Sequence, residues 1–178
     1  TDIKKCANVY MAFVGRLPEL QSLKEKLHIY NQVLLAGPSG SGKTWLVKKY
    51  LQNQNVKSSN ICWLNFGLPT WPYLQEHEKN IQFEDYFSQV FSSRLFKFQF
   101  IICDQFHKLT TTQQSFLSSF AEQILDPIKF IFIASELVDY LDHQVITLGE
   151  MTATEAEEVF RLNFPQLNSS QFAETFTQ

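Results

Sequence analysis

A short apolar run, Val33 to Ala36, leads directly into the sequence Gly-Pro-Ser-Gly-Ser-Gly-Lys-Thr at positions 37–44. This order of strand, glycine-rich loop and helix is the Walker A pattern, and it constrains the fold more than any other feature of the chain. Glycines let the backbone curl so that successive N–H groups point at phosphate oxygens, and the helix that follows adds the positive end of its dipole. We therefore expect the nucleotide to be bound by Gly37, Pro38, Ser39, Gly40, Ser41, Gly42, Lys43, Thr44 and Trp45.

The last two positions of the pattern carry the specific chemistry. Lys43 is expected to reach the β- and γ-phosphates, and the Thr44 hydroxyl is expected to ligate Mg²⁺. A chance match is a poor alternative, because all eight positions fit and helix-forming residues follow. The pattern predicts that the chain binds ATP or ADP with Mg²⁺, and it does not choose between ATP and GTP.

Asp104 ends a second apolar run, Phe98 to Cys103, in the manner of a Walker B motif. A carboxylate at the carboxyl end of a parallel strand faces the phosphate crevice, where it can hold Mg²⁺, usually through water. Many ATPases place a glutamate next, as the base that activates water, but this chain has Gln105. Glutamine orients water without accepting its proton, so we expect slow or partner-dependent hydrolysis. His107 is expected at the surface or at a helix edge.

Ser135 follows another apolar run, Phe130 to Ala134. A small polar residue there can sense the γ-phosphate or place the attacking water. It can equally be the N-cap of a helix that begins at Glu136, and the two interpretations carry equal weight.

Strand and helix signals alternate along the chain. Buried apolar strands interleaved with amphipathic helices predict an α/β fold, an αβα three-layer P-loop NTPase with a five-stranded parallel sheet. Residues 1–150 would form this core, and 151–178 the start of a helical lid. Capping-box patterns at Thr111–Gln114 and Thr152–Glu155 mark two helix starts, and a last helix is expected near Asn168. The expected strands are 32–36, 61–66, 98–103, 129–134 and 144–148.

Composition excludes several classes of function. The formal net charge is −3, so tight DNA binding by this domain alone is not expected. The three cysteines show no paired spacing, and Cys62 and Cys103 lie in apolar runs, which is typical of reduced core residues in an intracellular protein. No apolar run approaches membrane-spanning length, so no membrane association is expected.

With Val14-Gly15-Arg16 placed before the first helix, the order of motifs resembles the AAA+ superfamily. It is most similar to the origin-recognition initiator clade and to the related STAND signalling ATPases. The resemblance implies that the Walker B strand is separated from the Walker A strand by the fourth strand. It also implies that Val14 lies near the base, and Arg16 near the phosphates; a simple ion pair between Arg16 and Glu19 is the alternative.

The favoured hypothesis is a nucleotide-dependent switch that works with other protein subunits or with further domains of its own chain. The alternative is an origin-recognition subunit that binds ATP structurally. A small-molecule kinase is a remote third, because such enzymes usually carry an arginine-rich lid.

Overall fold

The computed structural model describes residues 15–67, 83–124, 127–136, 138 and 144–163. They fall into two compact units, one formed by residues 17–150 and the other by 1–16 together with 151–178. The first unit contains a five-stranded parallel sheet with the order β2-β3-β4-β1-β5. Its strands are β1 (Gln32–Ala36), β2 (Ile61–Asn65), β3 (Phe100–Asp104), β4 (Lys129–Ala134) and β5 (Val145–Thr147).

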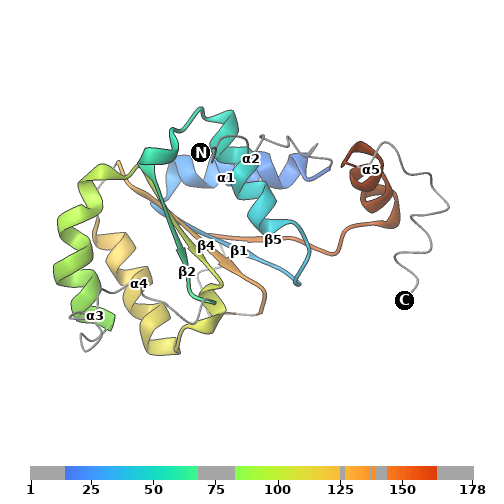
Figure 1. The fold of residues 1–178 in the computed structure, drawn as a ribbon. Helices are drawn as coiled ribbons and strands as arrows, with labels where there is room; N and C mark the ends of the chain where they lie inside the picture. The colour runs from blue at the N-terminus through green and yellow to red at the C-terminus, as the bar shows by residue number, and fades with distance from the viewer. Residues whose placement is uncertain (1–14, 68–82, 125–126, 137, 139–143, 164–178) are drawn as a thin grey trace, which may run out of the picture. The chain divides into compact units, whose positions relative to one another are not determined.

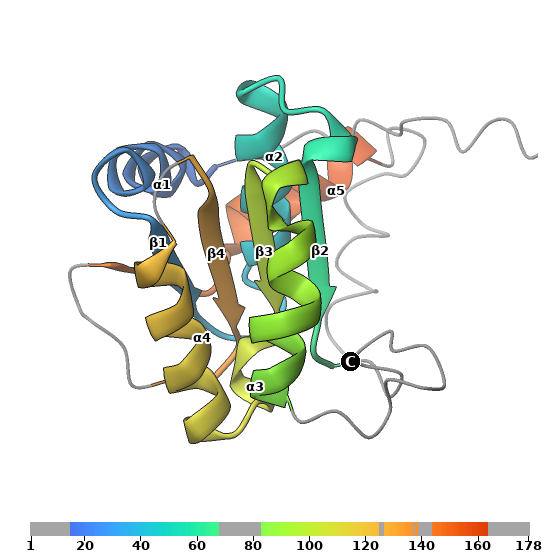
Figure 2. The same ribbon diagram turned by 90° about the vertical axis from the view of Figure 1, so that its left-hand side faces the viewer.

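Helices cover both faces of this sheet (Figure 1). On one face lie α1 (Leu17–Ile29) and α2 (Lys43–Asn53). On the other lie α4 (Thr111–Gln123) and the helical stretch that begins with α3 (Phe83–Asp85), which stand in front of the strands in Figure 2. The three-layer P-loop fold and the position of β4 between β1 and β3 are as predicted. Shorter turns lie at η1 (Ser58–Asn60) and η5 (Phe106–Lys108).

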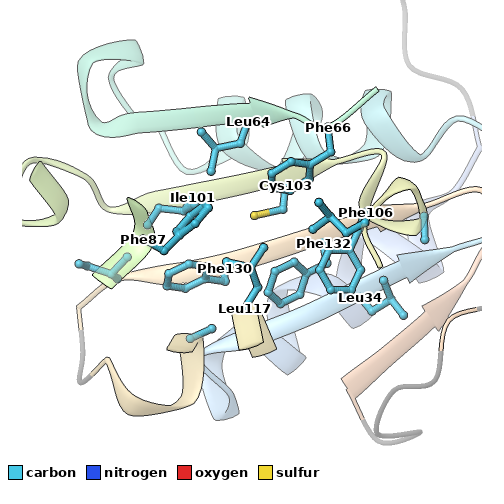
Figure 3. Close-up of a cluster of buried hydrophobic side chains, with 14 of the residues drawn as sticks. Leu34, Leu64, Phe66, Phe87, Ile101, Cys103, Phe106, Leu117, Phe130 and Phe132 are labelled. Carbon is cyan, nitrogen blue, oxygen red and sulfur yellow. The ribbon is translucent and has the colours of Figure 1, made fainter. Parts of the chain in front are cut away.

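The core between the sheet and α4 is rich in phenylalanine (Figure 3). Alternate residues of each strand point to this face, because successive side chains of a strand leave on opposite sides. Phe130 and Phe132 of β4 are fully buried there, and Leu117 of α4 packs against them. Cys103 is buried in this cluster and Cys62 lies against it, as expected for core cysteines, and burial raises the pKa of Cys62 to about 11.

Two local predictions were wrong in detail. The spacing of apolar residues over 83–91 predicts one amphipathic α-helix, but the structure has a single α-helical turn that continues as a π-helix, η3 (Tyr86–Phe91), and then as a 3₁₀ helix, η4 (Ser92–Lys97). The capping box of α4 begins one residue earlier than predicted. Thr110 accepts from Gln113 N at 3.3 Å, and Gln113 Oε1 accepts from Thr110 N at 3.0 Å.

The shift has a physical reason. Thr110 has extended dihedral angles, so it is the last residue outside the helix and the only one of the two threonines that can act as the cap. The Gln114 side chain is engaged elsewhere, because its Nε2 donates to Leu109 O at 2.9 Å.

In the second unit the predicted box at Thr152 and Glu155 is present and opens α5 (Ala153–Asn163). Glu155 N donates to Thr152 Oγ1 at 3.2 Å, and Thr152 N donates to Glu155 Oε2 at 2.8 Å. The helix expected near Asn168 lies outside the described residues. Across the part of the chain that the structure describes, no helix has the length and apolar character needed to span a membrane.

Candidate phosphate-binding site

The carboxyl ends of three neighbouring strands bring the predicted site residues to one edge of the sheet. The loop 37–42 follows β1, Asp104 ends β3, and Ser135 follows β4. Since β4 pairs with both β1 and β3, the loop and Asp104 are separated by the width of one strand. Such an edge is where ligands bind in open α/β sheets.

The loop adopts a backbone that glycine favours. Gly40 and Gly42 have φ of 80° and 90°, values that cost other residues energy. Ser41 is buried, and its N–H donates to Pro38 O at 3.2 Å, which closes the turn. Gly42 is the N-cap of α2 and offers no side chain to the first amides of that helix. The loop and the helix start thus present backbone N–H groups, the donors suited to phosphate.

Lys43 is buried within its own loop, with 5% of its surface exposed. Its Nζ donates to Gly37 O and Pro38 O, both at 2.7 Å, and to Ser41 Oγ at 3.3 Å. Burial lowers the pKa of this ammonium, and the negative charge of Asp104 partly opposes that shift. The loop therefore holds the Lys43 ammonium against neutral backbone and hydroxyl oxygens, and an anion such as phosphate could replace these as its partner.

The next two residues differ in exposure. Thr44 is half-buried at the first turn of α2, whereas Trp45 is 43% exposed. Lys48 lies over the Trp45 ring, with its Nζ 5.2 Å from the ring centroid, and 5.9 Å from the centroid of Trp63 on the edge strand β2. This cation–π arrangement fixes Trp45 beside the loop.

Asp104 is buried at the end of β3, opposite Asn65 in the register with β2. Its Oδ1 accepts from Gln105 N at 2.9 Å. Gln105 has φ 59° and ψ 36°, a left-handed conformation that is uncommon for residues other than glycine. A methyl group placed on Gly67 would come within 3.0 Å of Gln105 Cγ, so this side chain leans toward the end of β2. That is the side of β3 away from the loop.

The sequence suggested that His107 lies at the surface or at a helix edge. It does lie at the edge of a helical turn, but its side chain is not at the surface. Its side chain is 5% exposed, and its Nδ1 accepts from Ser135 N at 3.1 Å. Burial lowers the pKa of His107; Glu136 opposes this shift, Lys108 and Lys43 reinforce it, and Asp104 opposes it weakly. Sequence reasoning missed this contact because no motif spacing connects the two positions.

Arg16 belongs to the second unit, and Val14 lies outside the described residues. Hydrogen bonds from the Thr152 backbone and hydroxyl lower the pKa of Glu155, and the charge of Arg16 adds to this effect. A methyl group on Gly15 would come within 2.8 Å of Glu155 Oε1. The predicted closeness of Arg16 to phosphate stays a prediction.

A family model described as AAA domain matches residues 30–167, which is most of the chain. The chain belongs to this AAA domain family. It is therefore an AAA-type ATPase module, and the match spans the loop, Asp104, Ser135 and α5.

Two solved structures from archaea share the fold. The Walker-type ATPase PABY2304 of Pyrococcus abyssi is 15% identical with a TM-score of 0.56, over 92% of this chain and 62% of that one. Cdc6p of Pyrobaculum aerophilum is 14% identical with a TM-score of 0.61, over 93% of this chain and 54% of that one. This chain thus spans less than two thirds of the length of either neighbour. No curated protein sequence matches it.

Replacing Gly37 with alanine should destabilise the fold. Gly37 has φ 148°, and an added Cβ would lie 2.1 Å from Leu148 O, a backbone atom that cannot move aside alone. Leu148 is tied to the strand before the loop, because its N–H donates to Ala36 O at 2.8 Å. We expect Gly37→Ala to lower the free energy of unfolding by about 2 kcal/mol or more, measured by urea unfolding.

Gly149→Ala is the matched control. A methyl group there meets no atom of the described residues within 4 Å, and we expect a change of no more than about 0.5 kcal/mol. Equal stability of the two variants would contradict the close approach of Gly37 to Leu148.

Proposed function

We propose that residues 37–44 bind the phosphates of ATP or ADP, and that Lys43 supplies the central positive charge. The observation that carries this proposal is the buried Lys43 ammonium, held by two carbonyls and one hydroxyl of its own loop. A phosphate is a better partner for this cation than neutral oxygens are, because its negative charge adds a direct electrostatic attraction to the hydrogen bond. Phosphate binding would therefore recover part of what burying the ammonium costs.

The residues present also fit a magnesium ion. Mg²⁺ prefers oxygen ligands and is usually held through one or two carboxylates, water and the phosphates themselves. Thr44 offers a hydroxyl in the first turn of α2, and Asp104 offers a buried carboxylate at the end of β3, with one strand, β4, between it and the loop. When bound, the ion would supply positive charge between the phosphates and this carboxylate. The chain's own part is to hold these two side chains at one edge of the sheet.

We further propose that the module is a nucleotide-dependent switch whose hydrolysis is slow or depends on a partner. Gln105 has no carboxylate to accept a proton, and it leans away from the loop. Ser135 would report the presence of the γ-phosphate from the end of β4. The nucleotide would then persist long enough to set a conformation, and partner subunits or further domains would read it.

Lys43→Ala should weaken ADP binding in the presence of Mg²⁺ by at least about a hundredfold, since a charged hydrogen bond contributes about 1.5–3 kcal/mol and the ammonium serves more than one phosphate oxygen. Isothermal titration calorimetry measures both affinities. Lys49→Ala on the same helix is the control, and its affinity should equal that of the unmodified chain. Equal affinity of Lys43→Ala and the unmodified chain would rule out this loop as the site.

Gln105→Glu should raise the rate of ATP turnover, because a carboxylate can take the proton of the attacking water. General-base assistance is typically worth about 10²–10⁴-fold, and we expect at least tenfold here because the side chain must first turn toward the loop. Phosphate release at saturating ATP is the measurement, and Gln105→Ala, which also lacks a base, should stay slow. Rapid steady hydrolysis by the unmodified chain would show that slow turnover is the wrong description.

The likeness to the Cdc6p fold supports a second candidate, an origin-recognition-like subunit that uses ATP structurally. A net charge of −3 disfavours DNA contacts by this module alone, since affinity for duplex DNA depends on neutralising phosphates. Fluorescence polarisation with labelled duplex DNA separates the candidates. We expect no salt-sensitive binding at submicromolar protein, and such binding would favour the origin-recognition candidate.

A further inference from the structure

His107 lies at the edge of the proposed site but belongs to no motif that predicts a function. It is in η5, three residues after Asp104, and its neighbour Lys108 is exposed while its own side chain is buried. A buried histidine makes a hydrogen bond with at least one ring nitrogen in most proteins. Here the partner is the backbone of Ser135, 28 residues further along the chain.

The direction of this hydrogen bond defines the state of the ring. Ser135 N–H is the donor, so Nδ1 of His107 carries no proton and the neutral ring holds its proton on Nε2. Nε2 lies 4.0 Å from Glu136 Oε1, which is beyond hydrogen-bonding distance. The bond that places the ring is therefore the one to Ser135.

The turn that carries His107 is itself fixed by the core. Phe106 is buried, and its ring centroid lies 4.5 Å from that of Phe132 (Figure 3). Gln114 of α4 holds the backbone of the same turn, with its Nε2 donating to Leu109 O at 2.9 Å and to Phe106 O at 3.4 Å. His107 thus projects from a rigid base.

Ser135 lacks comparable support from the sheet. The pairing of β4 with β1 ends at Ala134, opposite Ala36, and its pairing with β3 ends earlier, at Phe132, opposite Cys103. Ser135 is the first residue beyond both ladders, and its N–H bonds to the imidazole instead of to a neighbouring strand. Without that acceptor, neither of the two ladders of β4 would hold the Ser135 amide.

We propose that His107 is a positioning residue, whose Nδ1 holds the backbone of Ser135 so that this residue can distinguish a nucleoside triphosphate from a diphosphate. The inference rests on the proposed function, since it assumes nucleotide on the loop and a sensing role for Ser135. It assigns to His107 no contact with the nucleotide. His107 should therefore affect only the affinity for nucleotides that carry a γ-phosphate, and ADP should bind equally well when His107 is replaced.

The test compares the affinities of ATPγS and ADP, each with Mg²⁺, by calorimetry. His107→Phe keeps a buried ring but removes the acceptor, and it should change the ratio of the two affinities about five- to tenfold, the effect of one hydrogen bond, in the direction shown by Ser135→Ala. His107→Asn should keep the ratio of the unmodified chain, because Asn Oδ1 stands close to the place of Nδ1. His107→Gln is equally polar but places its oxygen further out, so it should behave like His107→Phe.

Lys108→Ala is the control within the same turn and should leave both affinities unchanged. A cooperative thermal transition shows that each variant is folded. If His107→Phe is unstable, the comparison of His107→Asn with His107→Gln still tests the proposal. A ratio in His107→Gln equal to that of the unmodified chain, while Ser135→Ala alters it, overturns the inference. If the unmodified chain binds neither nucleotide, the proposed function fails; if ADP binds and only the ratio test fails, the positioning role alone is wrong.

Discussion

The pairing of β4 with both β1 and β3 is the constraint on which the candidate site depends. It is the central strand of the sheet, its Phe130 and Phe132 side chains fill the core beneath α4, and its end separates the loop from Asp104. The register sets Ala134 opposite Ala36, so Ser135 and Gly37 both follow the last pair of one ladder. Packing the two aromatic rings of β4 beneath α4 thus also fixes where Ser135 stands relative to Gly37, because a one-residue slip of the strand would turn both rings to the opposite face of the sheet.

Much of this arrangement could be predicted from residues alone. Few folds place an apolar strand directly before a Walker A loop, and the bounds of β1 and β4 agree with the sequence patterns. The prediction that β4 lies between β1 and β3 depends on the family resemblance. Nothing in the hydrophobic pattern orders strands within a parallel sheet, because each strand is apolar on both faces.

The predictions that failed concern competition between near-equal local options. Thr110 and Thr111 both precede a glutamine by three positions, and only the backbone angles of Thr110 decide which one caps α4. The stretch after Asp85 keeps its apolar spacing but widens to a π-helix, a change in hydrogen bonding that spacing alone does not predict. The prediction for His107, a place at the surface or at a helix edge, holds only in its second part: the side chain is buried, and its hydrogen-bond partner Ser135 is distant in sequence.

Three hydrogen bonds are made by the residues that directly follow β5, β2 and β4, and they differ in chemistry. Leu148 N, after β5, donates to Ala36 O at the end of β1, and Phe66 N, after β2, donates to Asp104 O at the end of β3. Both join backbone groups, so neither depends on a side chain. The third bond, made by Ser135 N after β4, ends on the imidazole of His107. Of the three bonds it is therefore the one that replacing a single side chain removes. In the proposed switch this difference is useful. The segment after β4 could change its conformation with the γ-phosphate while the loop and the sheet keep their conformations.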